Sequence, residues 1–423
     1  MNSFNELGVD TFLTEKLKER SIVKPTAIQN LVIPALLAGK SVVFRSATGT
    51  GKTFAYLLPL LQRLGALETG ASQAPAIVIC APTLELCSQI KAEVDFLTGK
   101  GAEKSDTGAH GTGVKPEVQL QPQSLLLIGS VRLDKQIESL KKIRPAIVVG
   151  NPGRLLVLAK MGKLRLQNLR FLVMDEADRL TVQESFEETK EFLAIIERSI
   201  SRSNNNNLCL VACSATVSEK TRAQLGPLFE SAEIVESSDH EILRERIEHW
   251  ALFSEKRRKV QSLRSLLSAL KGKKSRVKAL VFTSRSDEAD KILSQLQYHS
   301  ISAAGLFGKV NKKPMTSMER KAALDSFREG RVEALVSTDL AARGLDIPGI
   351  THVIALDVPS DGEVYIHRCG RTGRAGKRGI MITIGDETQL RLLASMEKRL
   401  KIRIQPKELY GGRVCVPEIE EDV

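Results

Sequence analysis

The sequence predicts an α/β fold of two tandem domains, each a mostly parallel sheet covered by helices on both faces. Two observations predict this fold. Apolar strand-like runs alternate with helical patterns, and one polar stretch divides those runs into two series. The 423 residues suffice for two domains of ordinary size, and a hydrophobic content of 42% supports a core in each. We place the first domain at residues 1–236, a linker at 237–245, the second domain at 246–412 and a short acidic tail at 413–423.

Short apolar runs mark the expected strands. In the first series they are Ala76–Cys80, Ser124–Ile128, Ala146–Val149, Phe171–Met174 and Leu208–Ala212. In the second series they are Ala279–Phe282, Ala334–Val336, His352–Leu356 and Gly379–Ile384. The segment from Thr98 to Pro122 is rich in glycine and polar residues, so we expect a surface insertion there.

A glycine-rich turn joins an expected strand, Ser41–Arg45, to an expected helix, Thr53–Leu64. Glycines in such a turn let backbone N–H groups point at phosphate oxygens, and the start of the helix adds to the attraction. Lys52 can reach the outer phosphates, and the Thr53 hydroxyl can bind Mg²⁺. A purely structural turn is the competing interpretation, which the Gly-x-Gly-Lys-Thr string disfavours. The turn consists of Ser46, Ala47, Thr48, Gly49, Thr50, Gly51, Lys52 and Thr53.

Two acids follow the apolar run Phe171–Met174. The carboxyl ends of parallel strands are where open α/β sheets bind their ligands. Asp175 suits magnesium, and Glu176 can orient and deprotonate an attacking water. An acidic pair is more often solvated surface, but together with the phosphate-binding turn it predicts a nucleoside triphosphatase.

The ordered set of such segments resembles the DEAD-box ATP-dependent RNA helicases. The resemblance extends from Phe4 to about Arg413 and implies two RecA-like domains, ATP and Mg²⁺ as cofactors, RNA as substrate, and ATP hydrolysis coupled to domain closure, strand bending and local unwinding or ribonucleoprotein remodelling. The matching segments are Lys24–Gln29, Ser46–Thr53, Pro82–Leu86, Asn151–Arg154, Asp175–Asp178, Ser214–Thr216, Leu280–Arg285, Ser337–Asp339, Arg343–Asp346 and His367–Arg374.

The resemblance also implies roles for individual residues at the ATP site. Phe4 and Gln29 would contact the adenine, and Asp346 the ribose. Arg374 would be an arginine finger and Arg371 a second ligand of the γ-phosphate. His367 would connect to the coupling residues, which are Asp178, Ser214 and Thr216. ATP should therefore bind in the cleft between the two halves.

RNA contacts are implied by the same resemblance. They go mainly to the backbone and the 2′-hydroxyl, so sequence preference should be weak. In the first domain they are Pro82, Thr83, Gly129, Gly153 and Arg154. In the second they are Arg285, Arg320 and Thr338.

Several residues depart from the family pattern. Leu84 stands where an arginine usually holds an RNA phosphate, and Glu319 stands where glutamine is usual. We therefore expect a weakened grip on RNA, with a partner protein or another surface supplying specificity. The remaining departures are Ser21-Ile22 for Gly-Phe, Gly129-Ser130 for Gly-Gly and Asn151 for threonine.

Composition limits the other partners. A net charge of +12 favours a polyanion, while aromatic residues, at 4%, are too scarce for base stacking to dominate. The six cysteines lack zinc-site spacing and fit a reducing cytoplasm. We favour a bacterial-type cytosol and leave a nuclear or organellar location open. No apolar run approaches a membrane span, and the N-terminus lacks the layout of a signal peptide. We expect a monomer.

Two other functions compete with the helicase. One is an ATP-gated RNA clamp that acts as a ribonucleoprotein scaffold with little unwinding. The intact Glu176 and the Ser214–Thr216 segment favour an enzyme, while Leu84 and Glu319 indicate a weak grip on RNA. The other is a DNA translocase, against which the segments around Gln29 and Asp175 argue.

Overall fold

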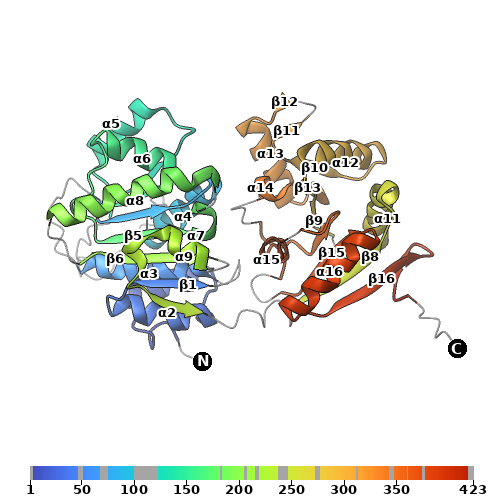
Figure 1. Ribbon diagram of the computed structural model, residues 1–423, viewed down its shortest axis with the longest axis horizontal. Coiled ribbons are helices and arrows are strands. Elements are labelled where there is room, and N and C mark those ends of the chain that lie inside the picture. Colours follow the sequence, from blue (N-terminus) through green and yellow to red (C-terminus); the bar gives the residue numbers. More distant parts are fainter. Residues whose placement is uncertain are drawn as a thin grey trace, which may run out of the picture. The chain divides into compact units, whose positions relative to one another are not determined.

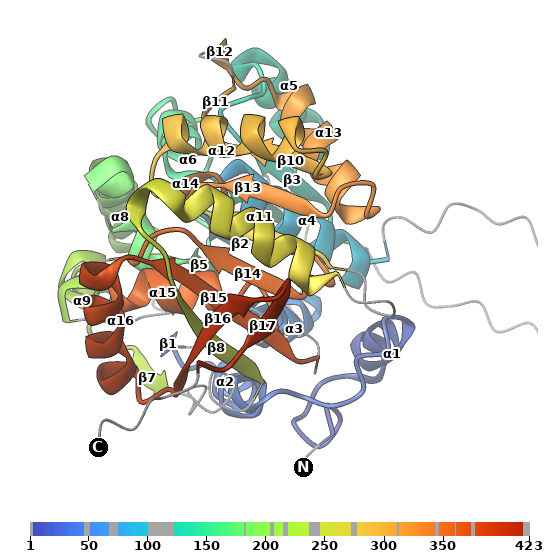
Figure 2. The same ribbon diagram turned by 90° about the vertical axis from the view of Figure 1, so that its right-hand side faces the viewer.

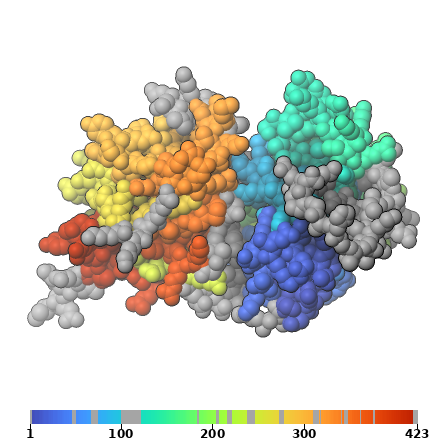
Figure 3. All heavy atoms as spheres, turned by 180° about the vertical axis from the view of Figure 1, so that it is seen from behind, coloured from blue at the N-terminus to red at the C-terminus, as the bar shows by residue number. Residues whose placement is uncertain are grey.

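The fold is described from a computed structural model of the chain. It describes residues 3–45, 51–66, 75–99, 122–181, 183–203, 207–214, 219–236, 246–271, 277–310, 313–342, 347–359, 361–373 and 377–417. The described residues up to Glu236 form one compact unit, and those from Arg246 onward form a second. In the space-filling view of Figure 3, the blue to green segments of the first unit lie together, and so do the yellow to red segments of the second. The expected linker at 237–245 lies outside the described residues, and the exact domain boundaries stay a prediction.

The first unit contains a parallel sheet that, in its described part, has seven strands in the order β3-β4-β2-β5-β6-β1-β7. Every pairing in it is parallel, because each strand is followed by a crossover that contains a helix. The strands are β1 (Val42–Arg45), β2 (Ile77–Cys80), β3 (Ser124–Leu127), β4 (Ile147–Gly150), β5 (Phe171–Asp175), β6 (Cys209–Ser214) and β7 (Glu233–Glu236).

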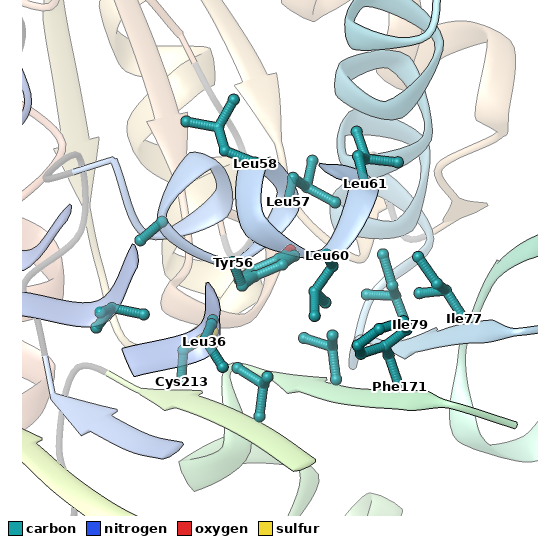
Figure 4. Packing of buried hydrophobic residues seen from close by; sticks show 14 of the residues in the cluster. Leu36, Tyr56, Leu57, Leu58, Leu60, Leu61, Ile77, Ile79, Phe171 and Cys213 are labelled. Atoms are coloured by element: carbon teal, nitrogen blue, oxygen red, sulfur yellow. The ribbon is translucent and has the colours of Figure 1, made fainter. Parts of the chain in front are cut away.

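Helices cover both faces of this sheet, and alternate residues of each strand pack against opposite layers. One layer holds α1 (Thr11–Glu19), α2 (Ala27–Leu37), α3 (Lys52–Gly65) and α4 (Leu84–Leu97). Figure 4 shows its core, in which Leu60 of α3 points toward Ile79 and Phe171 of the sheet. The other layer holds α5 (Leu133–Ile143), α6 (Pro152–Lys160), α7 (Ala177–Leu180), α8 (Gln183–Ser203), α9 (Glu219–Leu225) and the 3₁₀ turn η1 (Pro227–Phe229).

The second unit is built in the same way around a sheet whose order is β10-β13-β9-β14-β15-β8-β16-β17. All of its pairings are parallel except that of β16 with β17. The strands are β8 (Ile247–Phe253), β9 (Ala279–Phe282), β10 (Ala303–Leu306), β13 (Ala334–Ser337), β14 (His352–Ala355), β15 (Gly379–Gly385), β16 (Ile404–Tyr410) and β17 (Arg413–Cys415).

Its helices also lie in two layers (Figures 1 and 2). α11 (Lys259–Leu270) and α12 (Ser286–Tyr298) cover one face. α13 (Ser317–Arg328), α14 (Asp339–Ala342), α15 (Gly362–Cys369) and α16 (Glu387–Leu400) cover the other. A 3₁₀ turn, η2 (Lys256–Arg258), precedes α11, and a small hairpin, β11 (Lys309–Val310) with β12 (Lys313–Pro314), precedes α13. Two parallel-sheet α/β units confirm the predicted fold class.

Residues 413–415 form a strand, although the sequence placed them in the tail. Gly411 and Gly412 have φ values of 57° and 74°. Two consecutive left-handed residues form the tight turn that joins antiparallel strands, so Tyr410 pairs with Arg413. The second unit therefore extends at least to Cys415. Residues 418–423 of the acidic tail and 100–121 of the expected insertion lie outside the described residues.

Candidate functional site

The expected functional segments of the first unit meet at the carboxyl edge of its sheet. The segments expected to contact RNA follow β3, β4 and β2, which are neighbours in the sheet. Asp175 ends β5 and Glu176 follows it. Ser214 ends β6, Lys52 lies beyond β1, and these three strands are neighbours as well. The strand order thus groups the candidate RNA segments on one half of the edge and the candidate ATP segments on the other.

The described end of the glycine-rich turn is held by Gln29. Gly51 has a φ of 86°, and a Cβ at this position would lie 2.4 Å from Gln29 Nε2, so only glycine fits without rearrangement. Gln29 Nε2 donates to the Gly51 carbonyl at 3.0 Å, and its Oε1 accepts from the Thr26 N–H at 2.9 Å. The structure therefore ties Gln29 to the turn, and its contact with adenine stays a prediction. Ser46, Ala47, Thr48, Gly49 and Thr50 lie outside the described residues.

The Asp175 carboxylate is buried and receives three hydrogen bonds. The Tyr56 hydroxyl donates to Oδ2 at 2.8 Å. The Cys213 thiol and the Glu176 N–H donate to Oδ1 at 3.0 and 2.9 Å. Burial raises the pKa of Asp175, and the nearby charge of Lys52 opposes part of that increase. Lys52 and Asp175, which are far apart in the sequence, are therefore close in space.

The hydroxyl of Tyr56 lies between two candidate magnesium ligands. Burial, and then the charge of Asp175, raise the pKa of Tyr56 well above its ordinary value, so the phenol keeps its proton and donates it. A hydrogen bond with the Thr53 side chain opposes part of this increase. Tyr56 thereby connects Thr53 with Asp175.

Glu176 adopts a backbone conformation that side chains rarely take. Its φ and ψ are both 53°, in the left-handed region, which costs a non-glycine residue about 1–2 kcal/mol. Its Oε2 lies 3.3 Å from Arg179 Nε, and both side chains are largely buried. Strain of this kind gathers at functional sites, where surrounding structure maintains it.

The side chains of Asp178 and Ser214 are in contact, and their coupling role stays a prediction. Burial raises the pKa of Asp178, whereas the charge of Arg179 and a hydrogen bond from the Ser214 side chain oppose part of that increase. This contact connects the end of β6 with the acids that follow β5. Thr216, the third residue expected to couple the segments, lies outside the described residues.

The candidate RNA segments are braced against one another. Arg154 donates from Nη1 to Gln136 Oε1 at 3.0 Å and from Nη2 to the Gly129 carbonyl at 3.2 Å. Gln136 in turn donates to the Ile128 carbonyl at 3.0 Å. The end of β3 and the start of α6 are thus held by one arginine. In the same region Thr83 caps α4, with its hydroxyl accepting from the Leu86 N–H, and Pro82 is half-buried.

Gly153 lies against a carboxylate. A Cβ there would lie 2.8 Å from Glu188 Oε1, so a larger residue would have to displace Glu188. Leu84 is half-buried and packs against the core of the first unit. Phe4 is only 1% exposed and belongs to that core as well, so its contact with adenine stays a prediction.

The second unit contains a buried arginine that links two of its segments. Arg368 of α15 is 1% exposed. Its Nε and Nη2 each donate to the Asp339 carboxylate at 2.7 Å, and its Nη1 donates to Asp357 Oδ1 at 2.6 Å. These bonds fix α15, which carries His367, against the segments that follow β13 and β14. Arg371 lies just beyond α15 and is buried.

The three expected RNA contacts of the second unit fall in two places. Arg320 donates to the Ala341 carbonyl at 2.7 Å, and the Thr338 hydroxyl accepts from the Ala341 N–H at 3.4 Å, so α14 brings both together. Arg285 is exposed and paired with Asp287 at 3.0 Å. Arg374 and Asp346 lie outside the described residues.

Several residues at the site were not singled out by the sequence. Tyr56 lies one turn after Thr53 on α3, and Cys213 directly precedes Ser214, but in the sequence both resemble ordinary core residues. Arg179, Gln136 and Arg368 carry weaker signals, because a lone polar residue in a helix is usually solvated. Among the described residues, no cluster of three or more His, Cys, Asp or Glu side chains could hold a metal by itself.

Two family models match the chain. The first, described as DEAD/DEAH box helicase, matches residues 26–225, and the second, described as helicase conserved C-terminal domain, matches residues 258–376. The two matches fall one on each unit. The described helices include none long and apolar enough to cross a membrane.

Curated relatives extend over nearly the same length. The chain is 32% identical to the DEAD-box ATP-dependent RNA helicase CshC of Bacillus cereus, over 95% of this chain and 92% of the relative. It is also 32% identical to the probable ATP-dependent RNA helicase YfmL of Bacillus subtilis, over 96% and 97%.

Solved structures share the fold. S. cerevisiae Dbp5 bound to RNA and ADP BeF3 has a TM-score of 0.77 at 25% identity, covering 97% of this chain and 96% of that one. Mss116p bound to ssRNA and AMP-PNP has a TM-score of 0.81 at 25% identity, covering 97% and 80%.

Proposed function

Because the chain belongs to the family of DEAD-box ATP-dependent RNA helicases, we propose that its two units hydrolyse ATP together and use the reaction to bend and locally separate RNA strands. The protein is an ATP-dependent RNA helicase.

The observation that carries the proposal is the meeting of Lys52, Asp175 and Glu176 at one edge of the first sheet. Lys52 holds the outer phosphates of ATP. Glu176 orients the attacking water and accepts its proton. Phosphoryl transfer needs mainly positioning and neutralisation of charge, which this arrangement supplies.

The oxygen donors at this edge fit magnesium. Asp175 and the Thr53 hydroxyl are the candidate ligands, directly or through water. Mg²⁺ usually keeps several waters and binds one or two protein oxygens together with substrate phosphates, so this small set suffices. When bound with ATP, the ion neutralises charge that develops on the transferred phosphoryl group.

RNA binding depends on both units in this proposal. Pro82, Thr83, Gly129, Gly153 and Arg154 contact the strand in the first unit, and Arg285, Arg320 and Thr338 in the second. Arg371 and Arg374 of the second unit reach the γ-phosphate only after the units close. RNA that spans both units favours closure, so ATP and RNA bind cooperatively, each tightening the other by the same factor.

Two variants test the ATP site. Lys52→Ala should abolish phosphate release, because it removes the positive charge that binds the outer phosphates of ATP. Glu176→Gln should still bind ATP but fail to hydrolyse it, so the protein should remain on RNA. Lys40→Ala, which removes an exposed lysine paired with Glu233, is the control and should hydrolyse ATP like the wild type. Normal phosphate release by either site variant would contradict the assignment.

Separation of a short RNA duplex distinguishes the helicase from the clamp. The wild type should displace the labelled strand with ATP, and Glu176→Gln should not. Retention of RNA without displacement by the wild type would favour the ATP-gated clamp instead. We further propose that the chain acts as a cytoplasmic monomer, with a partner protein that supplies RNA specificity.

A further inference from the structure

The acids of the ATP site are supported by two buried side chains from different elements. Tyr56 of α3 and Cys213 of β6 are both fully buried. Figure 4 shows them in the layer between α3 and the sheet. Phenylalanine and alanine would fill similar space there without any polar atom, so packing alone does not require the hydroxyl or the thiol. Both groups instead donate to Asp175.

The three donors leave the carboxylate little freedom. An ionised carboxylate accepts about four hydrogen bonds. Cys213 and the Glu176 N–H use Oδ1, and Tyr56 uses Oδ2. About one acceptor position remains for a further partner, and the carboxylate cannot rotate without breaking the bonds already made.

From this geometry we infer that Tyr56 and Cys213 are positioning residues that orient Asp175 so that it takes magnesium through a bound water. Tyr56 also lies near Thr53, the other candidate ligand, one turn earlier on α3. Groups that orient metal ligands in this way typically change metal affinity about 10-fold to 100-fold when they are removed.

Cys213 gives the arrangement a connection to the adjacent segment. It directly precedes Ser214 on β6, and Ser214 bonds Asp178. A shift of β6 would therefore move donors to both Asp175 and Asp178. Cys209 provides a matched control, because it lies on the same face of the same strand, and its thiol donates to the Lys40 carbonyl at 3.2 Å.

The inference rests on the magnesium site of the proposed function, and its test measures binding rather than turnover. A fluorescent ADP analogue is bound to the full chain in EDTA and then during a Mg²⁺ titration. Tyr56→Phe should lower the apparent affinity for Mg²⁺ about tenfold. Its affinity for the analogue in EDTA should stay as in the wild type, and Cys209→Ala should match the wild type in both conditions.

Cys213→Ala and Cys213→Ser form a second, independent pair. Serine keeps a donor of similar size, so Cys213→Ser should retain more Mg²⁺ affinity than Cys213→Ala. This pair decides the matter if Tyr56→Phe does not fold.

The outcomes separate the inference from the proposal beneath it. Wild-type Mg²⁺ dependence in both Tyr56→Phe and Cys213→Ala would overturn the inference. Weakened binding already in EDTA would overturn it too, since it would indicate general support of the site. A wild type that binds the analogue equally with and without Mg²⁺ would instead contradict the proposed magnesium site.

Discussion

Glu319 stands where glutamine is usual in the family, and its environment explains why the acid is tolerated. Its carboxylate accepts from the Thr316 N–H at 2.8 Å and from the Thr316 hydroxyl at 2.9 Å. These bonds lower the pKa of Glu319. The bond from the Thr316 N–H to this carboxylate, together with the 3.2 Å bond from the Glu319 N–H to the Thr316 hydroxyl, forms a capping box at the start of α13, a role that glutamate and glutamine both fill. This departure therefore carries less weight against RNA binding than the sequence suggested.

Leu84 still predicts a weakened grip on RNA, because a leucine cannot donate a hydrogen bond to a phosphate. Leu84→Arg should tighten RNA binding and steepen its salt dependence by about one phosphate contact. Some packing should be lost, since Leu84 is half-buried against the core. The measurement is RNA affinity at several salt concentrations. Ala92→Arg, which adds the same charge two turns further along α4 at an exposed position, is the control. Equal slopes for the two variants would mean that Leu84 does not face RNA.

Most strands of the two sheets could be predicted, and those that were missed carry a weak strand signal in the sequence. Central strands such as Phe171–Asp175 are buried on both faces and read as unbroken apolar runs. Glu233–Glu236 and Ile404–Tyr410 lie toward the sides of their sheets and are half solvated. Their charged and polar residues hide the strand pattern. Ala303–Leu306 is made mostly of small residues and gives little signal either.

The residues of the site that supply a backbone shape or a charge could be predicted, and the buried residues that support them could not. The glycine-rich turn and the acids can be recognised from their residue types. Tyr56 and Cys213 resemble ordinary core residues until their neighbours are known. Hydrogen bonds between buried side chains depend on strands distant in the chain, and residue type alone does not specify them.

The C-terminus of α1 explains one departure from the family pattern, the Ser21-Ile22 pair in place of Gly-Phe. Ser21 has a φ of 59°. Its N–H bonds the Lys18 carbonyl, and the N–H of Ile22 bonds the Leu17 carbonyl. This is the Schellman motif, in which the position of Ser21 favours glycine and that of Ile22 an apolar residue. A glycine followed by phenylalanine, the pair usual in the family, would suit this helix end.

Ser21→Gly should stabilise the protein by about 0.5–1 kcal/mol, because glycine adopts the left-handed conformation without a Cβ clash. The gain is partly offset by the greater freedom of glycine in the unfolded chain. Thermal unfolding measures it. Ser21→Ala keeps the Cβ and is the control, with no gain expected. A melting temperature for Ser21→Gly at or below that of Ser21→Ala would refute the explanation.

His352, at the start of β14, should make stability fall in acid. Burial lowers the pKa of His352 from 6.5 to about 4. Between these values the unfolded chain binds more protons, so the free energy of unfolding decreases as pH falls from 6.5 to 4. Over that range the loss is at most about 3 kcal/mol. Between pH 7.5 and pH 4.5, the melting temperature of the wild type should fall further than that of His352→Gln. Equal losses would place the acid sensitivity elsewhere.

Across the whole molecule, the proposal divides the ATP site between two units. The first supplies the phosphate-binding lysine and the acids. In the second, the bonds of Arg368 to Asp339 and Asp357 fix the helix that leads to Arg371. On the proposed assignment neither unit holds the complete set of groups, so we expect hydrolysis to require closure of the two units and RNA to favour that closure.

RNA-stimulated phosphate release by Arg374→Ala tests this claim most directly. The side chain belongs to the second unit, so binding of ATP to the isolated first unit cannot depend on it. In the full chain, the wild type should hydrolyse ATP faster with single-stranded RNA than without it. Arg374→Ala should lose roughly 10³-fold or more of the stimulated rate, as removal of other arginine fingers does. A stimulated rate close to that of the wild type would contradict the division of the site between the two units.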